Sequence, residues 1–431
     1  MDSSIKDLII RRIDSIIRFF ICVMVVFLPL GIAVVEMSIG ICIFLWLVKR
    51  IILLLSCSVK NSSWLVWVKG FKPVDTSLNL WISFFLLLCL VSSFFGVQPL
   101  VSLRSFYGKI VEWFVVFFII IEFFDTKERI HRILYVFILI ACILSFDGLI
   151  QFYWLKKDVL KGIVLTSSGQ VSATFSSANS LGIFLALAIP ISIVFLFESL
   201  NKKIIWLNLL SVVLMLWVFV LTVSRGAWLA LTFSVILTGI TIPVLTSGRL
   251  KSKNIFIGLV GLLVIASIFV LESDFARAHF FQENTGSHRI TMWEDSFKML
   301  MDRPILGFGV NTFMKNFQFF RRDPYYFLTY AHNCYLQMLV EIGIVGFSIF
   351  VGMVIVYFRR LLHNLRVLFD EDKQMFLTGI GVFASLVAFF AHSFVDVDFY
   401  SLPLARLWWV LMGIGVAIGK LSNKTKIGRC P

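Results

Sequence analysis

Charged residues are scarce in this chain. Asp, Glu, Lys and Arg make up 15% of the 431 residues, whereas 59% of the residues are hydrophobic and 46 are Phe. Soluble domains carry about 25% charged residues, and the mean hydropathy of this chain is +0.94. The composition therefore excludes an ordinary soluble globular protein.

Paired cysteines and nucleotide-binding loops are also missing. The seven cysteines have no paired spacing, and Cys22, Cys42, Cys89 and Cys142 lie inside apolar runs. This pattern indicates neither a disulfide framework nor a zinc site. No GxxxxGK[ST] or GxGxxG segment occurs, so we expect no bound nucleotide and no cofactor.

A signal-peptide cleavage site is absent as well. The sequence MDSSIKDLIIRRIDSIIRFF at residues 1–20 is basic and then apolar, but no small-x-small site follows it. We therefore expect this segment to enter an uncleaved first helix.

Long apolar segments, in contrast, are abundant. Many approach or exceed about 18 residues, the length needed to cross the hydrocarbon of a bilayer. A helical bundle is expected, because lipid leaves every backbone amide in need of an internal partner. The expected helices lie near residues 14–31, 33–48, 78–95, 106–124, 133–154, 181–198, 204–222, 227–246, 254–271, 335–358, 375–393 and 402–420. The sequence thus predicts an all-α integral membrane protein with about 12 transmembrane helices, forming a single domain over residues 1–431.

Lys and Arg gather in alternate loops. If the N-terminus is cytoplasmic, most of the 39 Lys and Arg residues fall in cytoplasmic segments, and half of the outer ones lie in one long loop. Basic residues in short loops favour the cytoplasmic side, and long loops are exempt from this rule. We therefore expect both termini in the cytoplasm. Topology also explains the net charge of +14, so no nucleic-acid partner is expected.

One long polar insertion, at residues 272–331, interrupts the apolar series between the ninth and tenth expected helices. Under this orientation it is a periplasmic loop. Part of it has an amphipathic pattern, which predicts helical segments lying on or dipping into the outer membrane interface. The apolar positions of that pattern are Met292, Trp293, Phe297, Met299 and Leu300. The candidate site residues in or next to the loop are His279, His288, Arg289, Arg303 and His332.

Two arginines at the expected outer boundary are candidate anion ligands. Arg225 stands between two apolar helices with almost no loop around it, and Arg289 precedes the amphipathic pattern. A guanidinium offers rigid donors that match phosphate geometry. The alternatives are that Arg225 snorkels at the boundary and that Arg289 pairs with Glu294 or Asp295. Arg303 is a weaker candidate, since a cation at a helix C-terminus is often only solvated.

His332 precedes Asn333 at the outer mouth of the tenth expected helix. An imidazole is partly neutral near pH 7 and can act as a general base. The alternative is a neutral interfacial side chain. Glu341 lies deeper and roughly on the far side of that helix, so we expect it to cap or cross-link neighbouring helices rather than to orient His332.

A metal site is not expected. The spacings of His279, His288 and His332 match no standard ligand set. Asp396 and Asp398 look like a metal-binding acidic pair, but a structural role in an outer turn fits them as well.

Four segments, in this order, resemble the O-antigen ligase family, which also includes O-antigen polymerases and some protein O-oligosaccharyltransferases. They are TFSSANSLGIFLALAIP, TVSRGAWLAL, HRITMWEDSFKMLMDRPILGFGVNTF and AHNCYLQMLVEIGIVGF. The resemblance covers roughly residues 165–415, and the first third of the chain matches mainly in hydropathy.

The resemblance implies a C-type membrane glycosyltransferase of the bacterial inner membrane, most like a lipid A–core:O-antigen ligase. Such an enzyme transfers polysaccharide from undecaprenyl diphosphate to the lipid A–core oligosaccharide on the periplasmic face, with inversion and without a metal, among membrane lipids. Arg225 and Arg289 would then bind the donor diphosphate, and His332 would act catalytically at the acceptor. The possible supporting residues are Arg303, Asn333 and Ser224.

Two other functions stay open. A polymerase would use the same lipid-linked donor with a different acceptor. A polysaccharide-lipid transporter would need charged residues inside several helices along a central path, whereas here charge gathers at one face and in one loop. The sequence also lacks the paired, interrupted helices of inverted-repeat transporters.

Overall fold

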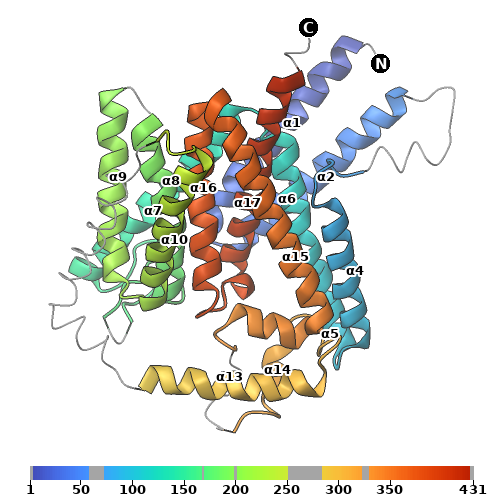
Figure 1. Cartoon of the computed structure of the whole chain (residues 1–431), viewed down its shortest axis with the longest axis vertical. Coiled ribbons are helices and arrows are strands. Elements are labelled where there is room, and N and C mark those ends of the chain that lie inside the picture. The colour runs from blue at the N-terminus through green and yellow to red at the C-terminus, as the bar shows by residue number, and fades with distance from the viewer. Residues whose placement is uncertain are drawn as a thin grey trace.

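The computed structural model describes residues 3–57, 72–166, 169–198, 201–250, 284–322 and 330–427. Helices dominate these residues, and their only β-type pairing is an isolated bridge between Lys157 and Val164. Long helices stand side by side as a bundle, and two shorter helices, α13 and α14, lie across one end (Figure 1). The start of α1 and the end of α17 lie at the opposite end.

The bundle helices follow the apolar runs of the sequence. Their bounds are α1 (Ser3–Phe27), α2 (Ile32–Cys57), α4 (Asn79–Phe95), α5 (Pro99–Ser105), α6 (Glu112–Phe123), α7 (Lys127–Ile150), α8 (Ala178–Glu198), α9 (Lys202–Leu221), α10 (Arg225–Leu245), α15 (Cys334–Glu371), α16 (Lys373–His392) and α17 (Leu402–Ile427). Helices α13 (Asn284–Asp302) and α14 (Phe313–Phe317) belong to the polar insertion. Short irregular helical turns are η1 (Phe106–Val111), η2 (Gln151–Leu155) and η3 (Asp398–Tyr400).

Eight helices in the described part of the chain are long and apolar enough to cross a membrane. The chain is therefore an all-α, multi-pass integral membrane protein, as the composition predicted. The span expected at 254–271 lies outside the described residues, so the count of about twelve stays a prediction. The helix expected at 335–358 is longer than its apolar run and continues to Glu371.

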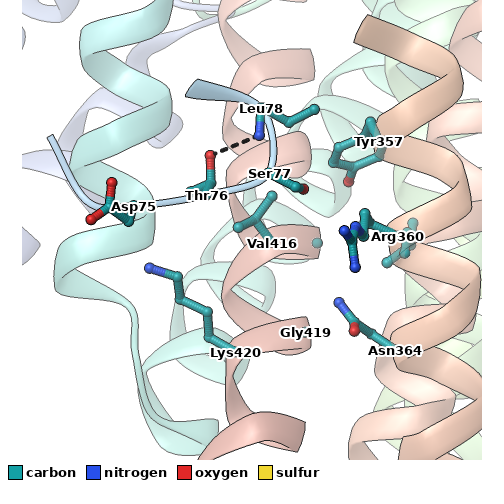
Figure 2. A pocket seen from close by; sticks show the side chains of 12 residues that line it. Asp75, Thr76, Ser77, Leu78, Tyr357, Arg360, Asn364, Val416, Gly419 and Lys420 are labelled. Atoms are coloured by element: carbon teal, nitrogen blue, oxygen red, sulfur yellow. Dashed lines mark hydrogen bonds between the residues drawn. The ribbon is translucent and has the colours of Figure 1, made fainter. Parts of the chain in front are cut away.

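Glycines allow helices inside the bundle to approach closely. A Cβ on Gly413 would lie 2.9 Å from Ile120 of α6, and one on Gly415 would lie 2.1 Å from the Tyr357 hydroxyl of α15. A Cβ on Gly419 would lie 2.1 Å from the Asn364 amide, which faces it across the same interface (Figure 2). Small residues that let backbones approach are typical of membrane helix packing. These glycines therefore allow close helix packing within the bundle.

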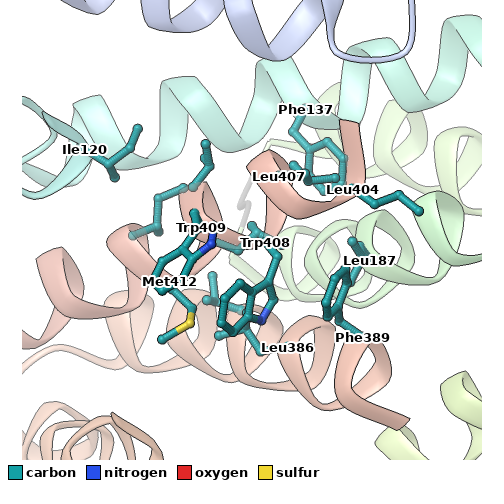
Figure 3. Packing of buried hydrophobic residues seen from close by; sticks show 14 of the residues in the cluster. Ile120, Phe137, Leu187, Leu386, Phe389, Leu404, Leu407, Trp408, Trp409 and Met412 are labelled. Carbon is teal, nitrogen blue, oxygen red and sulfur yellow. The ribbon is translucent and has the colours of Figure 1, made fainter. Parts of the chain in front are cut away.

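Aromatic side chains fill the centre of the bundle around α17. Trp408 and Trp409 are almost fully buried. The ring of Trp408 stacks on Phe389 of α16 at 5.8 Å, and Trp409 meets Phe114 of α6 edge-on at 4.4 Å (Figure 3). These rings fix α17 against its neighbours by area and by shape.

One buried cation is neutralised within the bundle. Arg406 of α17 is 1% exposed. Its Nε lies 2.6 Å from Glu112 Oε1 of α6, and a second guanidinium nitrogen contacts Glu36 of α2. An unpaired charge at this position would be costly, so the two carboxylates account for its presence.

Helix α15 is broken at Gly343, whose backbone (φ 67°, ψ 180°) is open essentially to glycine alone. In an unbroken helix Ile344 N would donate to Val340 O. Instead, Ile344 N donates to Pro304 O at 2.8 Å, and Val340 O accepts from Phe308 N at 3.0 Å. The polar insertion therefore satisfies the backbone groups that the break releases.

Glu341 secures the same segment with both its backbone and its side chain. Its carbonyl accepts from Gly309 N at 2.8 Å, and its buried carboxylate accepts from Asn311 N at 2.7 Å and Phe313 N at 3.2 Å. The expectation that Glu341 cross-links neighbouring elements is confirmed. We call residues 303–313 the docked loop.

We predict that Gly343→Ala destabilises the protein. A Cβ there would lie 2.0 Å from Ile305 O, and an L residue with this backbone costs on the order of 1–3 kcal/mol before any loop contact is lost. The melting temperature in detergent should fall by several degrees. Gly40→Ala is the matched control, because nothing lies within 4 Å of a Cβ at that position of α2. Equal melting temperatures for the two variants would contradict the prediction.

Candidate functional site

Two helices begin side by side with capped N-termini at the end of the bundle that carries α13. Ser224 caps α10, where its hydroxyl accepts from Ala227 N at 3.4 Å. Asn333 caps α15, where its side chain accepts from Tyr335 N and Leu336 N, each at 3.0 Å. Ser224 and Asn333, two of the three predicted supporting residues, thus have a structural role in starting a helix.

A chain of side-chain contacts joins these helix starts to that of α8. The Ser224 hydroxyl donates to Asn179 Oδ1 at 2.8 Å, and the Asn179 side-chain amide nitrogen donates to Asp396 Oδ2 at 3.0 Å. Asp396 Oδ1 lies 3.5 Å from His332 Nδ1, a separation that fits an ion pair better than a hydrogen bond. We call Ser224, Asn179, Asp396 and His332 the Asp396 network.

His332 lies on a sharp turn just outside its helix. Its backbone has φ 47°, and Val223, just before Ser224, has φ 46°. Such left-handed backbones are uncommon outside glycine, and they concentrate at functional sites. The His332 side chain is 36% exposed, so one side of the imidazole faces Asp396 and another is accessible from solvent.

Asp396 stays ionised down to low pH. Burial raises the pKa of this carboxyl, but contact with His332 and the nearby His392 outweigh burial and lower the pKa to about 2. Val397 N also donates to Asp396 Oδ1 at 2.9 Å. A fixed negative charge therefore lies beside His332.

A second His–Asp pair supports the first from inside the protein. His392 Nδ1 lies 2.8 Å from Asp398 Oδ2, and both side chains are buried. Cys334 fastens the start of α15 to the same turn, because its thiol donates to Asp396 O at 3.2 Å and accepts from Phe399 N at 3.5 Å. The turn that carries Asp396 is thus held on several sides.

Helix α13 brings Arg289 toward this place. The indole of Trp293 donates to Ala331 O at 3.0 Å, next to His332. Arg289 precedes Trp293 by four residues and so lies on the same face of the helix. Its charge also acts electrostatically on His392. The structure therefore places Arg289 on the His332 side of α13.

The alternative pairing of Arg289 is wrong. Glu294 Oε2 and Asp295 Oδ1 both bind Arg322, the latter at 2.7 Å from Arg322 Nε. Lys298 is a further partner of Asp295 at 3.1 Å. The carboxylates of α13 are thus engaged by other cations.

The other two arginines have different surroundings. Arg225 is the first residue of α10, is exposed, and follows the cap Ser224 directly. Arg303 stands at the end of α13 with its guanidinium 5.6 Å from the Phe308 ring centre, within the docked loop. No contact in the described residues links Arg303 to the Asp396 network, so a supporting role for it stays a prediction.

The residues that were considered and rejected as metal ligands are only partly described. His279 and the side chain of His288 lie outside the described residues. Asp398 binds His392 and Ser393, and Asp396 belongs to its own network. Among the residues that the structure describes, no group of three His, Cys, Asp or Glu side chains is arranged to hold a metal ion.

Sequence reasoning missed Asn179 and the link between Asp396 and His332. Asn179 stands in the segment TFSSANS, and it bonds a carboxylate 217 residues away. One feature of the sequence could have indicated the network. Each of its four residues lies directly beside an apolar run, at the end of that run expected on the outer side.

The arrangement favours an anion. The N-terminus of a helix carries partial positive charge, and α8, α10 and α15 all begin around Asp396. Arg225 and Arg289 add two full positive charges, against the single charge of Asp396. The site therefore combines a cationic surface with an imidazole that has a carboxylate behind it.

These features define a multi-pass membrane protein with a polar, cationic site at one end of its bundle. Residues 210–351 match the family described as O-antigen ligase. The exopolysaccharide production protein ExoQ of Rhizobium meliloti (strain 1021) is 23% identical over 237 residues, which cover 52% of this chain and 53% of ExoQ. The chain thus aligns with about half the length of that relative. The part of the chain that is similar to the O-antigen ligase family holds Arg225, Arg289 and His332.

We predict that the Asp396 charge stabilises the fold above about pH 4. Its pKa falls from the ordinary 3.8 to about 2 in the folded protein. This difference contributes about 2 kcal/mol to the free energy of unfolding at neutral pH. A depressed carboxyl pKa gives stability that is present above the unfolded pKa and lost as the pH falls through the folded pKa. Asp396→Asn should therefore lower the melting temperature by a few degrees at pH 6, and the difference should shrink between pH 4 and 2.

Asp75→Asn is the control for this measurement, because Asp75 is 77% exposed and pairs with the exposed Lys72. Its melting temperature should equal that of the wild type at each pH. A gap between wild type and Asp396→Asn that persists unchanged at pH 2 would contradict the role of the carboxylate charge.

Proposed function

We propose that the chain is an O-antigen ligase, which transfers a glycan from undecaprenyl diphosphate to a hydroxyl of the lipid A–core oligosaccharide. We place it in the bacterial inner membrane, with cytoplasmic termini and a periplasmic active site. The distribution of Lys and Arg supports this orientation. The observation that carries the proposal is the meeting of His332, Asp396 and three helix N-termini beside Arg225 and Arg289.

The donor head group matches the charge of the site. A diphosphate leaves the sugar readily when its negative charge is neutralised as it develops. Arg225 and Arg289 supply guanidinium groups, and the starts of α10 and α15 supply positive dipole ends. This set serves a diphosphate without requiring a metal ion.

The acceptor hydroxyl must lose a proton as it attacks the anomeric carbon. In the proposed step, the acceptor oxygen forms a bond to that carbon while the bond to the diphosphate oxygen breaks, and His332 takes the hydroxyl proton. Since Nδ1 faces Asp396, Nε2 is the nitrogen that receives the proton. Attack from the side opposite the leaving group inverts the anomeric configuration.

Helix α13 suits a place at the membrane surface. It lies across the end of the bundle (Figure 1), and Ile290, Phe297 and Met301 on it are each more than half exposed. Exposed apolar side chains on an amphipathic helix are typical of interfacial insertion. We propose that this surface and the apolar helices hold the prenyl chain near the cationic site.

A second candidate is a polysaccharide polymerase with the same donor. The similarity to ExoQ, whose name refers to exopolysaccharide production, favours this candidate. Its acceptor would be another lipid-linked chain instead of lipid A–core. Both candidates share the donor site, so they differ only in what presents the hydroxyl group to His332.

We predict that the three proposed residues are needed for transfer from purified lipid-linked donor to lipid A–core in a reconstituted assay. Loss of the imidazole should lower the rate by about 10²–10⁴-fold. Arg225→Ala and Arg289→Ala should each lower it by about 10²-fold or more. His332→Asn is the preferred variant, because Asn tolerates the left-handed backbone at this position.

Arg104→Ala is the control, since Arg104 is an exposed arginine of α5 at the same end of the bundle. Normal transfer by the His332 and arginine variants at equal protein level would remove these residues from the mechanism. The same assay identifies the acceptor. Transfer to lipid-linked glycan but not to lipid A–core would show that the protein is a polymerase. In cells, loss of a ligase leaves bare core and accumulated lipid-linked polymer, whereas loss of a polymerase leaves core capped with one repeat unit.

We also predict that transfer does not depend on a metal ion, because the arginines and helix N-termini neutralise the leaving group. The reconstituted rate should be unchanged after extended dialysis against EDTA and with or without added Mg²⁺ or Mn²⁺. Complete loss of activity in chelator, restored by a divalent cation, would contradict this and direct attention to Asp396 and Asp398 as ligands.

A further inference from the structure

A cavity with a polar part lies far from the Asp396 network. It has a volume of about 440 Å³ and is bordered by residues 75–78 before α4, by α15 and by α17. Pockets of about 300–1,000 Å³ are the usual size for small ligands. We call this cavity the α4–α15–α17 cleft.

The cleft lies at the opposite side of the expected membrane from His332. Arg360 lies 17 residues beyond the break at Gly343, which is about 26 Å along the second part of α15 at the helical rise. The hydrocarbon of a bilayer is about 30 Å thick. Helix α15 runs from the end of the bundle that carries α13 toward the end that holds the termini (Figure 1), so Arg360 lies toward the far membrane boundary.

Cationic and amide groups line one part of the cleft and apolar groups line the rest. Arg360 and Asn364 extend from α15, and Lys420 rises from α17 (Figure 2). Gly419 leaves space for the Asn364 amide to press against α17. Leu361 belongs to the apolar part of the wall.

The charge of the cleft is positive overall. Its bordering carboxylate, Asp75, lies 2.6 Å from Lys72 Nζ, so that negative charge is already matched by a cation outside the lining. Among the described residues, Arg360 has no carboxylate within ion-pair distance. The start of α4, at Asn79, adds positive dipole character beside the cleft.

We propose that the α4–α15–α17 cleft binds a phosphate-ester anion, with Arg360 as the charge partner and the neighbouring Asn364 amide as a hydrogen-bond donor. A guanidinium group offers rigid donors that match phosphate oxygens, and Lys420 adds positive charge to the opposite part of the wall. Basic pockets between transmembrane helices at the cytoplasmic side commonly bind anionic lipid head groups. The apolar wall and the position at the membrane boundary fit a phospholipid, and a water-soluble phosphate ester has the same binding chemistry.

The test is a binding titration with delipidated protein in detergent, followed by native mass spectrometry. Phosphatidylglycerol is the anionic probe and phosphatidylcholine the zwitterionic one. The double variant Arg360→Gln/Lys420→Gln should bind phosphatidylglycerol at least about tenfold more weakly than wild type, because the guanidinium contact and a second positive charge on the cleft wall are lost. The matched control is Arg359→Gln/Arg366→Gln, which removes two exposed charges from the same stretch of α15 outside the cleft.

A second variant keeps the test decisive if the double variant does not fold. Ser77→Glu places a carboxylate at an exposed position on the cleft border and disturbs no buried side chain. It should weaken phosphatidylglycerol binding in the same direction by charge repulsion.

Inorganic phosphate, measured by its effect on the melting temperature, separates the two ligand sources. Specific binding of phosphatidylglycerol that the cleft variants weaken supports the proposal with a lipid ligand. Stabilisation by inorganic phosphate alone, lost in the cleft variants, supports it with a water-soluble ligand. If neither probe distinguishes the cleft variants from wild type, or if the control variant loses as much affinity, the proposal is overturned.

Discussion

The carboxylate of Asp396 is the interaction around which the outer end of the bundle is arranged. It receives the Asn179 amide from α8, faces the imidazole before α15, and reaches the cap of α10 through Asn179. Helix starts that point at one place repel each other electrostatically, and a fixed negative charge among them lowers that cost. The same charge holds the imidazole without cancelling the cationic surface formed by the arginines.

The docked loop and the break in α15 stabilise the outer end of the bundle around Asp396. A continuous helix would leave the polar insertion attached only at its ends. Because Gly343 breaks the helix, Val340 and Glu341 offer carbonyl groups to Phe308 and Gly309. The first turns of α15, the docked loop and the end of α13 therefore form one packed unit with its own small core, which includes Met299 and Phe313.

Local patterns in the sequence predicted the helical membrane fold, because apolar runs and capping residues act through neighbouring positions. They also predicted Arg225, Arg289 and His332 as candidates, since a polar residue at the edge of an apolar run is unusual. The pairing of Asn179 with Asp396 was not predictable in this way. It joins residues 217 positions apart, and nothing in either segment specifies the partner. The break at Gly343 was hidden for a similar reason: a glycine in an apolar run fits a straight helix until the loop that replaces its hydrogen bonds is known.

The buried Arg406 has a consequence for how the protein is made. Its partners Glu36 and Glu112 belong to early helices, and Glu112 precedes it by 294 residues. During synthesis both acids are in place long before the arginine exists, and an unpaired carboxylate in a membrane helix is costly. Arrival of the last helix supplies the counter-charge and removes that penalty. Completion of the polypeptide is thereby coupled to closure of the helical bundle, and a chain cut short before α17 carries two acids without their counter-ion.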